Sequence, residues 1–203
     1  MDVSGTWTAV QGNNTTVVFN VRQSGSDIQV TGTFGGTQGS GGGFVEANVM
    51  YFQVDWPGSP NGEYIGQVLA DGSTFGVTQD LGSDNSAAAA GWHVIDRRFT
   101  PSPHSGSQMQ VAGSWEFDQG NALLYMDIQQ NGTLLQGSAR RARFGGPRTN
   151  ATGFVTPRIF WWTVPWSPSS VGHYVGTING RLRGTTADER NHSSARKWTG
   201  GRI

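Results

Sequence analysis

Apolar and polar residues alternate with a period of two through short stretches of this chain. Near the start, Val17, Phe19 and Val21 are apolar. Asn20 and Arg22, which lie among them, are polar. Successive side chains of a β-strand point to opposite faces, so this pattern predicts a strand with one buried face. No stretch keeps an apolar i, i+3, i+4, i+7 rhythm over several turns, and we therefore expect an all-β protein.

The first half of the chain divides into short predicted strands separated by turn residues. They lie near residues 4–10, 16–23, 27–34, 43–48, 49–56, 63–70, 73–79 and 91–99. Gly25, Asp71-Gly72 and Asn131-Gly132 indicate hairpin turns, because tight hairpins need positive φ. The glycine-rich stretch from Gly35 to Gly43 is expected to be a loop. Eight antiparallel strands in so short a segment favour closure into an up-and-down barrel, which removes exposed sheet edges.

Several sequence features occur twice. Residues 3–7 reappear as residues 111–115, and residues 43–66 match residues 153–176 without a gap. The paired residues include Trp7 and Trp115, Trp56 and Trp166, Tyr64 and Tyr174, Gly76 and Gly184, Asp80 and Asp188, and Trp92 and Trp198. So many ordered matches predict two tandem copies of one domain.

The repeat also predicts the domain boundaries. We expect a first eight-stranded barrel over residues 1–100 and a second over residues 111–203, related by a pseudo-two-fold axis. Residues 101–110, rich in Pro, Ser and Gly, are expected to form the linker.

Large aromatic side chains follow the period-two pattern on equivalent strands. The alternation predicts that they point into the barrels, where they either pack the core or face a ligand at the barrel mouth. The candidate ligand-binding residues are Phe52, Trp56, Tyr64, Trp162, Trp166 and Tyr174.

Two equivalent aromatic residues are predicted to point outward instead. Tyr51 and Trp161 precede the inward positions by one residue. Exposed aromatic side chains often mark an interface, so they indicate sugar stacking or contact between barrels. We favour contact between the barrels, and assembly of several chains stays open.

The net charge is zero, but it is unevenly distributed. Residues 1–103 hold three arginines against nine acidic residues, a charge of −6. Residues 104–203 hold eleven basic residues against five acidic ones, a charge of +6. Opposite charges on homologous halves indicate that the halves attract one another or a neighbouring copy, with drift on solvated faces as the alternative.

Several classes of chemistry lack the residues that they need. The chain has no cysteine, so it has neither disulfides nor thiolate metal sites. The histidines His93, His104, His173 and His192 have no counterparts across the repeat, and no metal-ligand spacing occurs. Asp80 and Asp188 are expected to be turn residues. We therefore expect no metal, no cofactor and no catalytic residues.

Other partners have little support in the sequence. A nucleic-acid site would depend on four arginines alone, Arg140, Arg141, Arg143 and Arg148. The sequence has no run of 18 apolar residues, which a membrane-spanning helix would need. We expect a soluble protein, and secretion from a bacterium after removal of a signal peptide stays open.

Trp7 and the ends of the repeats resemble the calycins, the group that contains lipocalins and avidins. In that group a Gly-x-Trp motif on the first strand is covered by an arginine from the last strand. The resemblance implies that Trp7 pairs with Arg97 or, as we favour, Arg98, and that Trp115 pairs with Arg202. A guanidinium over an indole contributes about 0.5–2 kcal/mol, so these four residues are expected to close the barrels structurally.

The second copy is also similar to the avidins. The segment Trp162-Thr163-Val164-Pro165-Trp166 resembles the strand that supplies a biotin-stacking tryptophan, and Gly172-x-Tyr174-Val175-Gly176 follows in the same order. Phe34 stands where the family has a tyrosine, and Gly180-Arg181-Leu182-Arg183 lacks the family's tryptophan. Because these polar and aromatic partners are missing, we do not expect biotin itself.

Three hypotheses about function remain, and a binding protein is favoured over an enzyme. The first is a non-catalytic binder of a small apolar or aromatic ligand in a calycin-like barrel. The second is a lectin-like or protein-interaction module that binds a glycan or a protein through surface aromatics. The third is a small-molecule cyclase or isomerase within the barrel.

Overall fold

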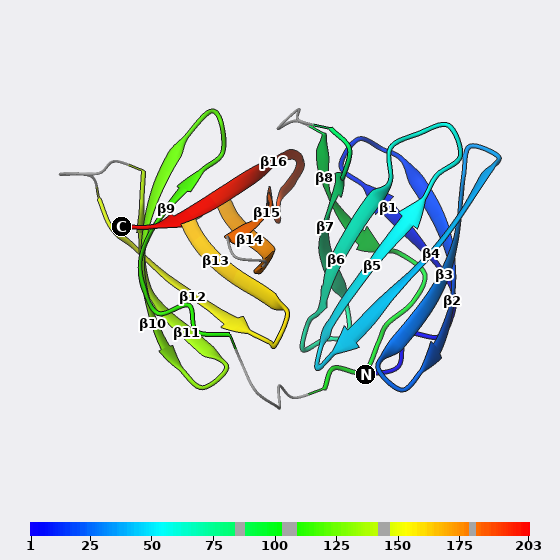
Figure 1. Cartoon of the computed structure of the whole chain (residues 1–203), viewed down its shortest axis with the longest axis horizontal. Helices are drawn as coiled ribbons and strands as arrows, with labels where there is room; N and C mark the ends of the chain where they lie inside the picture. The colour runs from blue at the N-terminus through cyan, green and yellow to red at the C-terminus, as the bar shows by residue number, and fades with distance from the viewer. Residues whose placement is uncertain (84–87, 103–108, 142–146, 179–181) are drawn as a thin grey trace.

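The chain forms two closed antiparallel β-barrels of eight strands each, arranged in tandem (Figure 1). The computed structural model describes residues 1–83, 88–102, 109–141, 147–178 and 182–203. Among these residues every regular element is a strand, and none is a helix long and apolar enough to cross a membrane. The predicted all-β fold of two tandem barrels is confirmed.

Each strand of the first barrel pairs with its neighbours in sequence, and β1 pairs with β8 to close the sheet. The strands of the first barrel are β1 (Gly5–Gln11), β2 (Thr16–Ser24), β3 (Asp27–Phe34), β4 (Thr37–Glu46), β5 (Val49–Asp55), β6 (Gly62–Val68), β7 (Thr74–Asp80) and β8 (Ala89–Val94).

The second barrel repeats this order and closes through pairing of β16 with β9. Its strands are β9 (Gly113–Asp118), β10 (Leu123–Asn131), β11 (Leu134–Arg140), β12 (Thr149–Val155), β13 (Ile159–Ser167), β14 (Ser170–Ile178), β15 (Leu182–Asp188) and β16 (Asn191–Arg202). Of the predicted linker, residues 103–108 lie outside the described residues, as do His104, Arg143, Gly180 and Arg181.

Most of the glycine-rich stretch that suggested a loop is part of a strand, and only Gly35 and Gly36 form a turn. β4 starts at Thr37, before the predicted start at residue 43, and pairs with both β3 and β5. A Cβ atom on Gly41 would lie 1.9 Å from the carbonyl oxygen of Gln53, and one on Gly43 would lie 1.9 Å from that of Tyr51. Glycine is therefore required because the backbones of β4 and β5 approach closely, which the expectation of a loop overlooked.

Aromatic side chains fill the interior of each barrel. In the first barrel Trp7 and Trp92, both fully buried, stack with ring centroids 6.2 Å apart. In the second barrel Phe117 stacks on Trp198 at 4.2 Å. Because these rings occupy the space between the two ends of each barrel, the interior is a packed core, and any open space for a ligand lies at the ends.

The end of the first barrel near the N-terminus is closed by the chain that precedes β1. The indole of Trp7 donates to the carbonyl oxygen of Val3 at 3.1 Å. The side-chain amide of Gln23 accepts from the amide of Val3 and donates to the carbonyl oxygens of Met1 and Gly25.

The second barrel is closed in the same way. Trp115 donates to the carbonyl oxygen of Val111 at 2.8 Å. Gln130 accepts from the amide of Val111 and donates to the carbonyl oxygens of Met109 and Gly132. This end of both barrels is therefore sealed by backbone that a glutamine side chain holds in place.

The arginines near these ends take different positions in the two barrels. The guanidinium of Arg202 lies over the ring of Trp115, with its Cζ 5.2 Å from the ring centroid. In the first barrel Arg97 reaches the start of β1, where it donates to the carbonyl oxygen of Ser4. Arg98 is exposed and pairs with Asp71 at 3.3 Å, away from Trp7.

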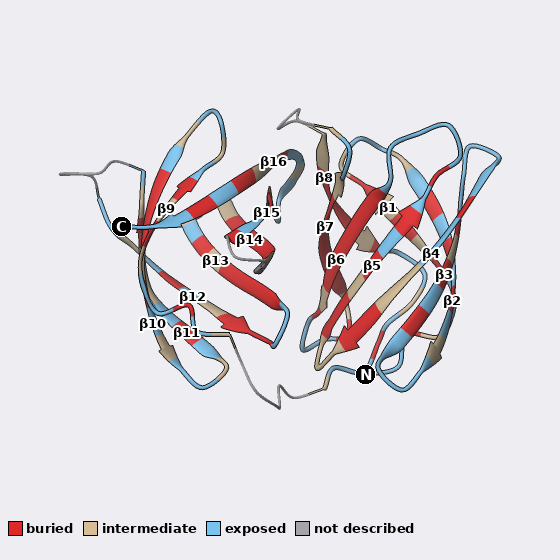
Figure 2. Cartoon of the chain, viewed as in Figure 1, coloured by how far each residue is buried: buried red, intermediate tan, exposed pale blue. Residues whose placement is uncertain are grey.

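The two barrels pack against one another through the outer faces of β4–β8 and β12–β16. The buried residues of this contact are Phe44, Val49, Ile65, Phe75, Val77, Phe154, Ile159, Trp161, Val175, Ala187 and Ala195, with Tyr51 and Ala89 packed against them. Strands such as β6 and β7 are therefore buried on both faces, whereas β2 alternates between buried and exposed residues (Figure 2).

Equivalent positions from both barrels meet in this contact. The ring of Phe75 in the first barrel lies against Trp161 in the second, with centroids 6.3 Å apart. Arg183 and Tyr51 are the counterparts of Phe75 and Trp161 in the repeat. The charge of Arg183 in the second barrel acts to lower the pKa of Tyr51 in the first. Such reciprocal pairs are typical of a two-fold arrangement.

Charged groups also cross the contact at its edge. Glu46 of the first barrel accepts from Arg158 at 2.5 Å and from the hydroxyl of Thr156 at 2.6 Å. Lys197 of the second barrel donates to the carbonyl oxygen of Asp80. Arg158 and Lys197, both basic residues of the second half, thus meet a carboxylate and a carbonyl oxygen of the first.

Candidate binding sites at the barrel mouths

The open end of the first barrel, its mouth, is built around the hydroxyl of Tyr64. Gln11, at the end of β1, donates to this hydroxyl at 3.3 Å through Nε2. The side chains of Trp56 and Thr78 lie beside the same hydroxyl and act to lower its pKa. Tyr64 and Thr78 are directly paired on β6 and β7, and Trp56 follows the end of β5.

The mouth of the second barrel has the same arrangement around Tyr174. The indole Nε1 of Trp166 donates to the Tyr174 hydroxyl at 3.2 Å. The side chains of Gln119 and Thr186 lie beside the same hydroxyl and act to lower its pKa. In the repeat, Trp166, Gln119 and Thr186 are the counterparts of Trp56, Gln11 and Thr78.

Equivalent glycines give the tryptophan and tyrosine rings room to meet. A Cβ atom on Gly62 would lie 3.1 Å from Nε1 of Trp56 and 2.9 Å from Cε2 of Tyr64. A Cβ atom on Gly172 would lie 3.0 Å from Nε1 of Trp166. A larger residue would force the indole away from the tyrosine hydroxyl, so the glycines belong to the same site.

The tyrosine hydroxyls remain protonated over the ordinary pH range. Burial is the largest cause that raises the pKa of both Tyr64 and Tyr174, while the hydrogen bonds from their neighbours act in the opposite direction. A neutral phenol both donates and accepts, which lets it connect the tryptophan, glutamine and threonine side chains into one network.

Open hollows lie against these networks. In the first barrel two adjoining hollows of about 310 and 280 Å³ share Gln11, Trp56, Tyr64 and Asp80. In the second barrel a hollow of about 360 Å³ is lined by Gln119, Trp166, Tyr174 and Thr186, among others. These volumes are at the lower end of the range of sites for small molecules.

The predicted ligand-binding residues separate into two groups. Trp56, Tyr64, Trp166 and Tyr174 lie at the mouths and line the hollows. Phe52 and Trp162 are fully buried and line none of these hollows, although Trp56, Tyr64 and Tyr174 belong to the same hydrophobic cores.

The predicted outward aromatics lie in the contact between the barrels. Trp161 is 1% exposed, and Tyr51 is half-buried against the same cluster.

Asp188 accepts from the backbone amide of Arg190 at 2.8 Å, the hydrogen bond of an Asx turn.

Sequence reasoning overlooked four of the mouth residues. Gln11 and Gln119 both follow the first-strand tryptophan by four positions, and Thr78 and Thr186 both precede the shared aspartate by two. The repeat therefore contains a signal for them, which a search limited to aromatic side chains misses.

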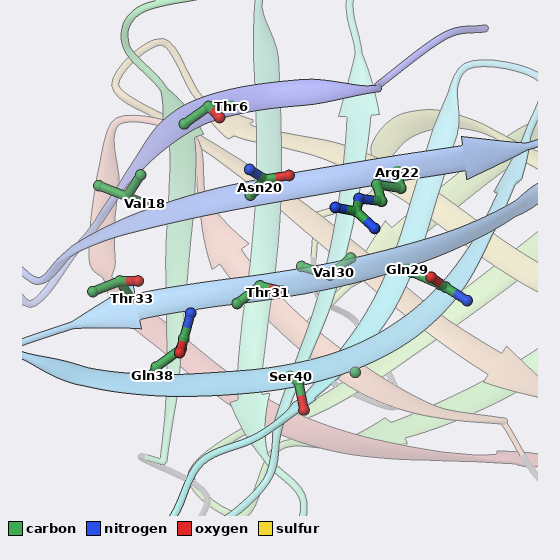
Figure 3. Close-up of a pocket in the computed structure, with 11 residues that line it drawn as sticks. Thr6, Val18, Asn20, Arg22, Gln29, Val30, Thr31, Thr33, Gln38 and Ser40 are labelled. Carbon is green, nitrogen blue, oxygen red and sulfur yellow. The ribbon is translucent and has the colours of Figure 1, made fainter.

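A separate hollow of about 730 Å³ lies on the outer surface of the first barrel, over β1–β4. Its side chains, among them Thr6, Asn20, Arg22, Gln38 and Ser40, project outward from these strands (Figure 3). No aromatic side chain lines this hollow among the described residues, so it lacks the flat apolar surface on which sugars stack.

In the part of the chain that the structure describes, no group of three or more His, Asp or Glu side chains is placed to hold a metal ion.

Comparison with known proteins adds little about function. No protein-family model matches the chain, and no curated protein matches its sequence. Among solved structures the chain is similar to a protein of unknown function from the DUF3598 family of Nostoc punctiforme, at 10% identity, over 98% of this chain and 94% of that chain, with a TM-score of 0.34. A likeness at this level carries no argument about function.

Proposed function

We propose that this protein is a calycin-like binding protein that holds a small, partly aromatic molecule at the mouth of each barrel. The observation that carries the proposal is the network around the tyrosine hydroxyl, which has the same four residue types in both copies. Core packing alone does not require it, because apolar residues would fill the same space without burying the polar side chains of Gln11, Thr78 and Thr186.

The mouths suit a ligand with a flat apolar part and at least one polar group. Each offers an indole and a phenol for packing, with a glutamine amide and a threonine hydroxyl beside them. Because aromatic rings fill the barrels below the mouths, the ligand would lie near the surface rather than deep inside.

The two alternative functions have less support. A lectin-like surface would need accessible aromatics, whereas Trp161 is buried in the contact between the barrels and the polar hollow over β1–β4 has no aromatic lining. A cyclase or isomerase would use the same mouths, so turnover of a ligand distinguishes it from simple binding.

The first experiment is native mass spectrometry of freshly purified protein, repeated under denaturing conditions. A small molecule that is released on unfolding supports the proposal and supplies the mass of the ligand. In parallel, ligand-observed NMR with a library of neutral aromatic compounds tests binding directly.

Variants then locate the binding. We expect Trp56→Leu and Trp166→Leu each to remove part of the binding, and the double variant to remove all of it. Leu134→Ala serves as the control, because Leu134 is exposed at the start of β11 near the sealed end. Equal binding by the double variant and the unaltered protein would overturn the proposal.

A further inference from the structure

The two mouths differ at one pair of equivalent positions. Phe34 lines the first mouth, and Arg141 occupies the corresponding position in the second. The register supports the correspondence, because β2 pairs Phe19 with Gly32 and β10 pairs Met126 with Ala139, two residues before Phe34 and Arg141 respectively. An apolar ring in one barrel is therefore replaced by a guanidinium in the other.

The charge around the second mouth is correspondingly positive. Its lining contains Arg141, Arg190 and Asp188. The carboxylate of Asp188 already accepts from the hydroxyl of Ser170 at 2.5 Å and from the backbone amide of Arg190 at 2.8 Å. The positive groups outnumber the single carboxylate, whose oxygens are engaged within the protein.

Arg141 is held in a position to meet a ligand. Its Cζ lies 5.0 Å from the centroid of the Trp166 ring, so the guanidinium lies over the indole that lines the hollow. Within the described residues Arg141 forms no ion pair. A guanidinium over an aromatic ring still has N–H groups in a planar fork, which match the two oxygens of a carboxylate.

The first mouth has the opposite character. Asp80 is the only charged side chain among the described residues that line it. Burial raises the pKa of Asp80, and the charge of Lys197 acts in the opposite direction. A second carboxylate brought beside Asp80 would be repelled, while Phe34 and Pro60 add apolar surface.

We propose that the second mouth selects a small carboxylate that carries a flat ring, and that the first mouth excludes such anions. The ring would pack beside Trp166 and Tyr174, and the carboxylate would pair with Arg141, with Arg190 adding positive charge. This inference rests on the proposed function, because it assigns the ligand class of one of the two mouths.

Three matched probes test the charge preference on the full chain: phenylacetate, phenylacetamide and 2-phenylethylamine. They share one ring and differ in charge, and their dissociation constants are measured by ligand-observed NMR titration. We expect phenylacetate to bind at least about tenfold more tightly than the other two at the second mouth, the effect of losing one hydrogen bond to a charged group.

The chain itself supplies the decisive variants. Arg141→Phe gives the second mouth the residue of the first, and we expect it to weaken phenylacetate binding about tenfold or more. Phe34→Arg makes the reverse change and should create phenylacetate binding at the first mouth. Both side chains are exposed, so both variants are expected to fold, which circular dichroism checks. Trp166→Leu identifies the mouth that is observed.

The outcomes separate this inference from the proposed function. If phenylacetate and phenylacetamide bind equally and Arg141→Phe changes the affinity of neither probe, the charge assignment is wrong. If Trp166→Leu then abolishes the binding of both probes, the proposal that the second mouth binds a ligand is still supported. If none of the three probes binds, the inference is overturned. The proposed function then depends separately on the neutral library and the double tryptophan variant.

Discussion

In the contact between the barrels, the indole Nε1–H of Trp161 donates a hydrogen bond to Nδ1 of His173, 3.1 Å away. The other ring nitrogen of His173, Nε2, lies 3.0 Å from a carboxylate oxygen of Glu189. Only the neutral imidazole with its proton on Nε2 can accept from Trp161 and donate to Glu189. A second proton, on Nδ1, would face the N–H of the indole.

This arrangement predicts that the protein loses stability in mild acid. Burial lowers the pKa of His173 below its ordinary value of 6.5, and Glu189 opposes this effect only in part. The unfolded chain therefore binds more protons than the folded chain between the lowered pKa and 6.5. The neutral form of His173 therefore contributes its full stabilisation above pH 6.5. The free energy of unfolding decreases as the pH falls from 6.5 toward the lowered pKa.

Urea unfolding at several pH values between about 7.5 and 5 measures this dependence. We expect His173→Gln, which cannot take up a proton, to flatten it. His192, whose pKa is also lowered by burial and by His93, contributes in the same direction, so His192→Gln is measured beside it. An unchanged pH dependence in His173→Gln would show that this histidine is not the cause.

Trp161→Ala tests how much the contact between the barrels contributes to stability. Trp161 is 1% exposed and packs against Phe75 of the other barrel, so its truncation leaves a cavity. We expect a loss of about 3–5 kcal/mol in the free energy of unfolding, measured by urea titration. Leu134→Ala, at a residue 59% exposed, is the control and should change stability by no more than about 0.5 kcal/mol. Equal effects of the two changes would mean that the contact contributes little.

Gly76→Ala tests the packing of the indole inside the first barrel. A Cβ atom on Gly76 would lie 2.2 Å from Cε2 of Trp92, which is fully buried. The added methyl group forces the indole or the strand to move, at a cost of about 1–3 kcal/mol or more. The thermal midpoint should fall, whereas Gly82→Ala should leave it nearly unchanged, because no atom lies within 4 Å of a Cβ there.

The sealed ends predict a matched pair of effects in the two barrels. Gln23→Ala and Gln130→Ala each remove three hydrogen bonds to backbone groups. Because these partners become partly unsatisfied, we expect each variant to lose about 1–3 kcal/mol of stability. Hydrogen exchange should show faster exchange at the amide of Val3 or Val111 in the corresponding variant. Gln29→Ala, at an exposed position on β3, is the control. Faster exchange at the amide of Val3 or Val111 in this variant as well would contradict a specific role for Gln23 and Gln130.

Much of the fold could be predicted because it depends on local patterns. The alternation of Val17, Phe19 and Val21 with polar residues identifies a strand with one buried face, and those three side chains are buried. The glycine at the β2–β3 hairpin, Gly25, has a φ of 62°, as the turn requires. The glycine-rich β4 was wrongly expected to be a loop, because its need for glycine arises from the approach of β5, a neighbour that composition does not reveal.

The candidate sites could be predicted only in part. The repeat placed Trp56 and Tyr64 in one class with Trp166 and Tyr174, and these residues do line the mouths. Phe52 lies on β5, which ends directly before Trp56, but it is fully buried and lines neither hollow of the first mouth. Depth within a barrel depends on strand tilt and on the rings that fill the interior, neither of which follows from alternation along one strand.

The sequence by itself determined the class of the protein, the two copies of its domain and the face of each strand that is buried. These properties follow from a period of two and from internal repetition, and both can be read along a single chain. Only the tertiary structure decided that Gln11, Trp56 and Thr78 meet at one tyrosine hydroxyl, and that His173 lies against an indole. Gln11 reaches Tyr64 from a strand 53 residues away, and the other contacts join neighbouring strands. They therefore depend on strand register and barrel closure.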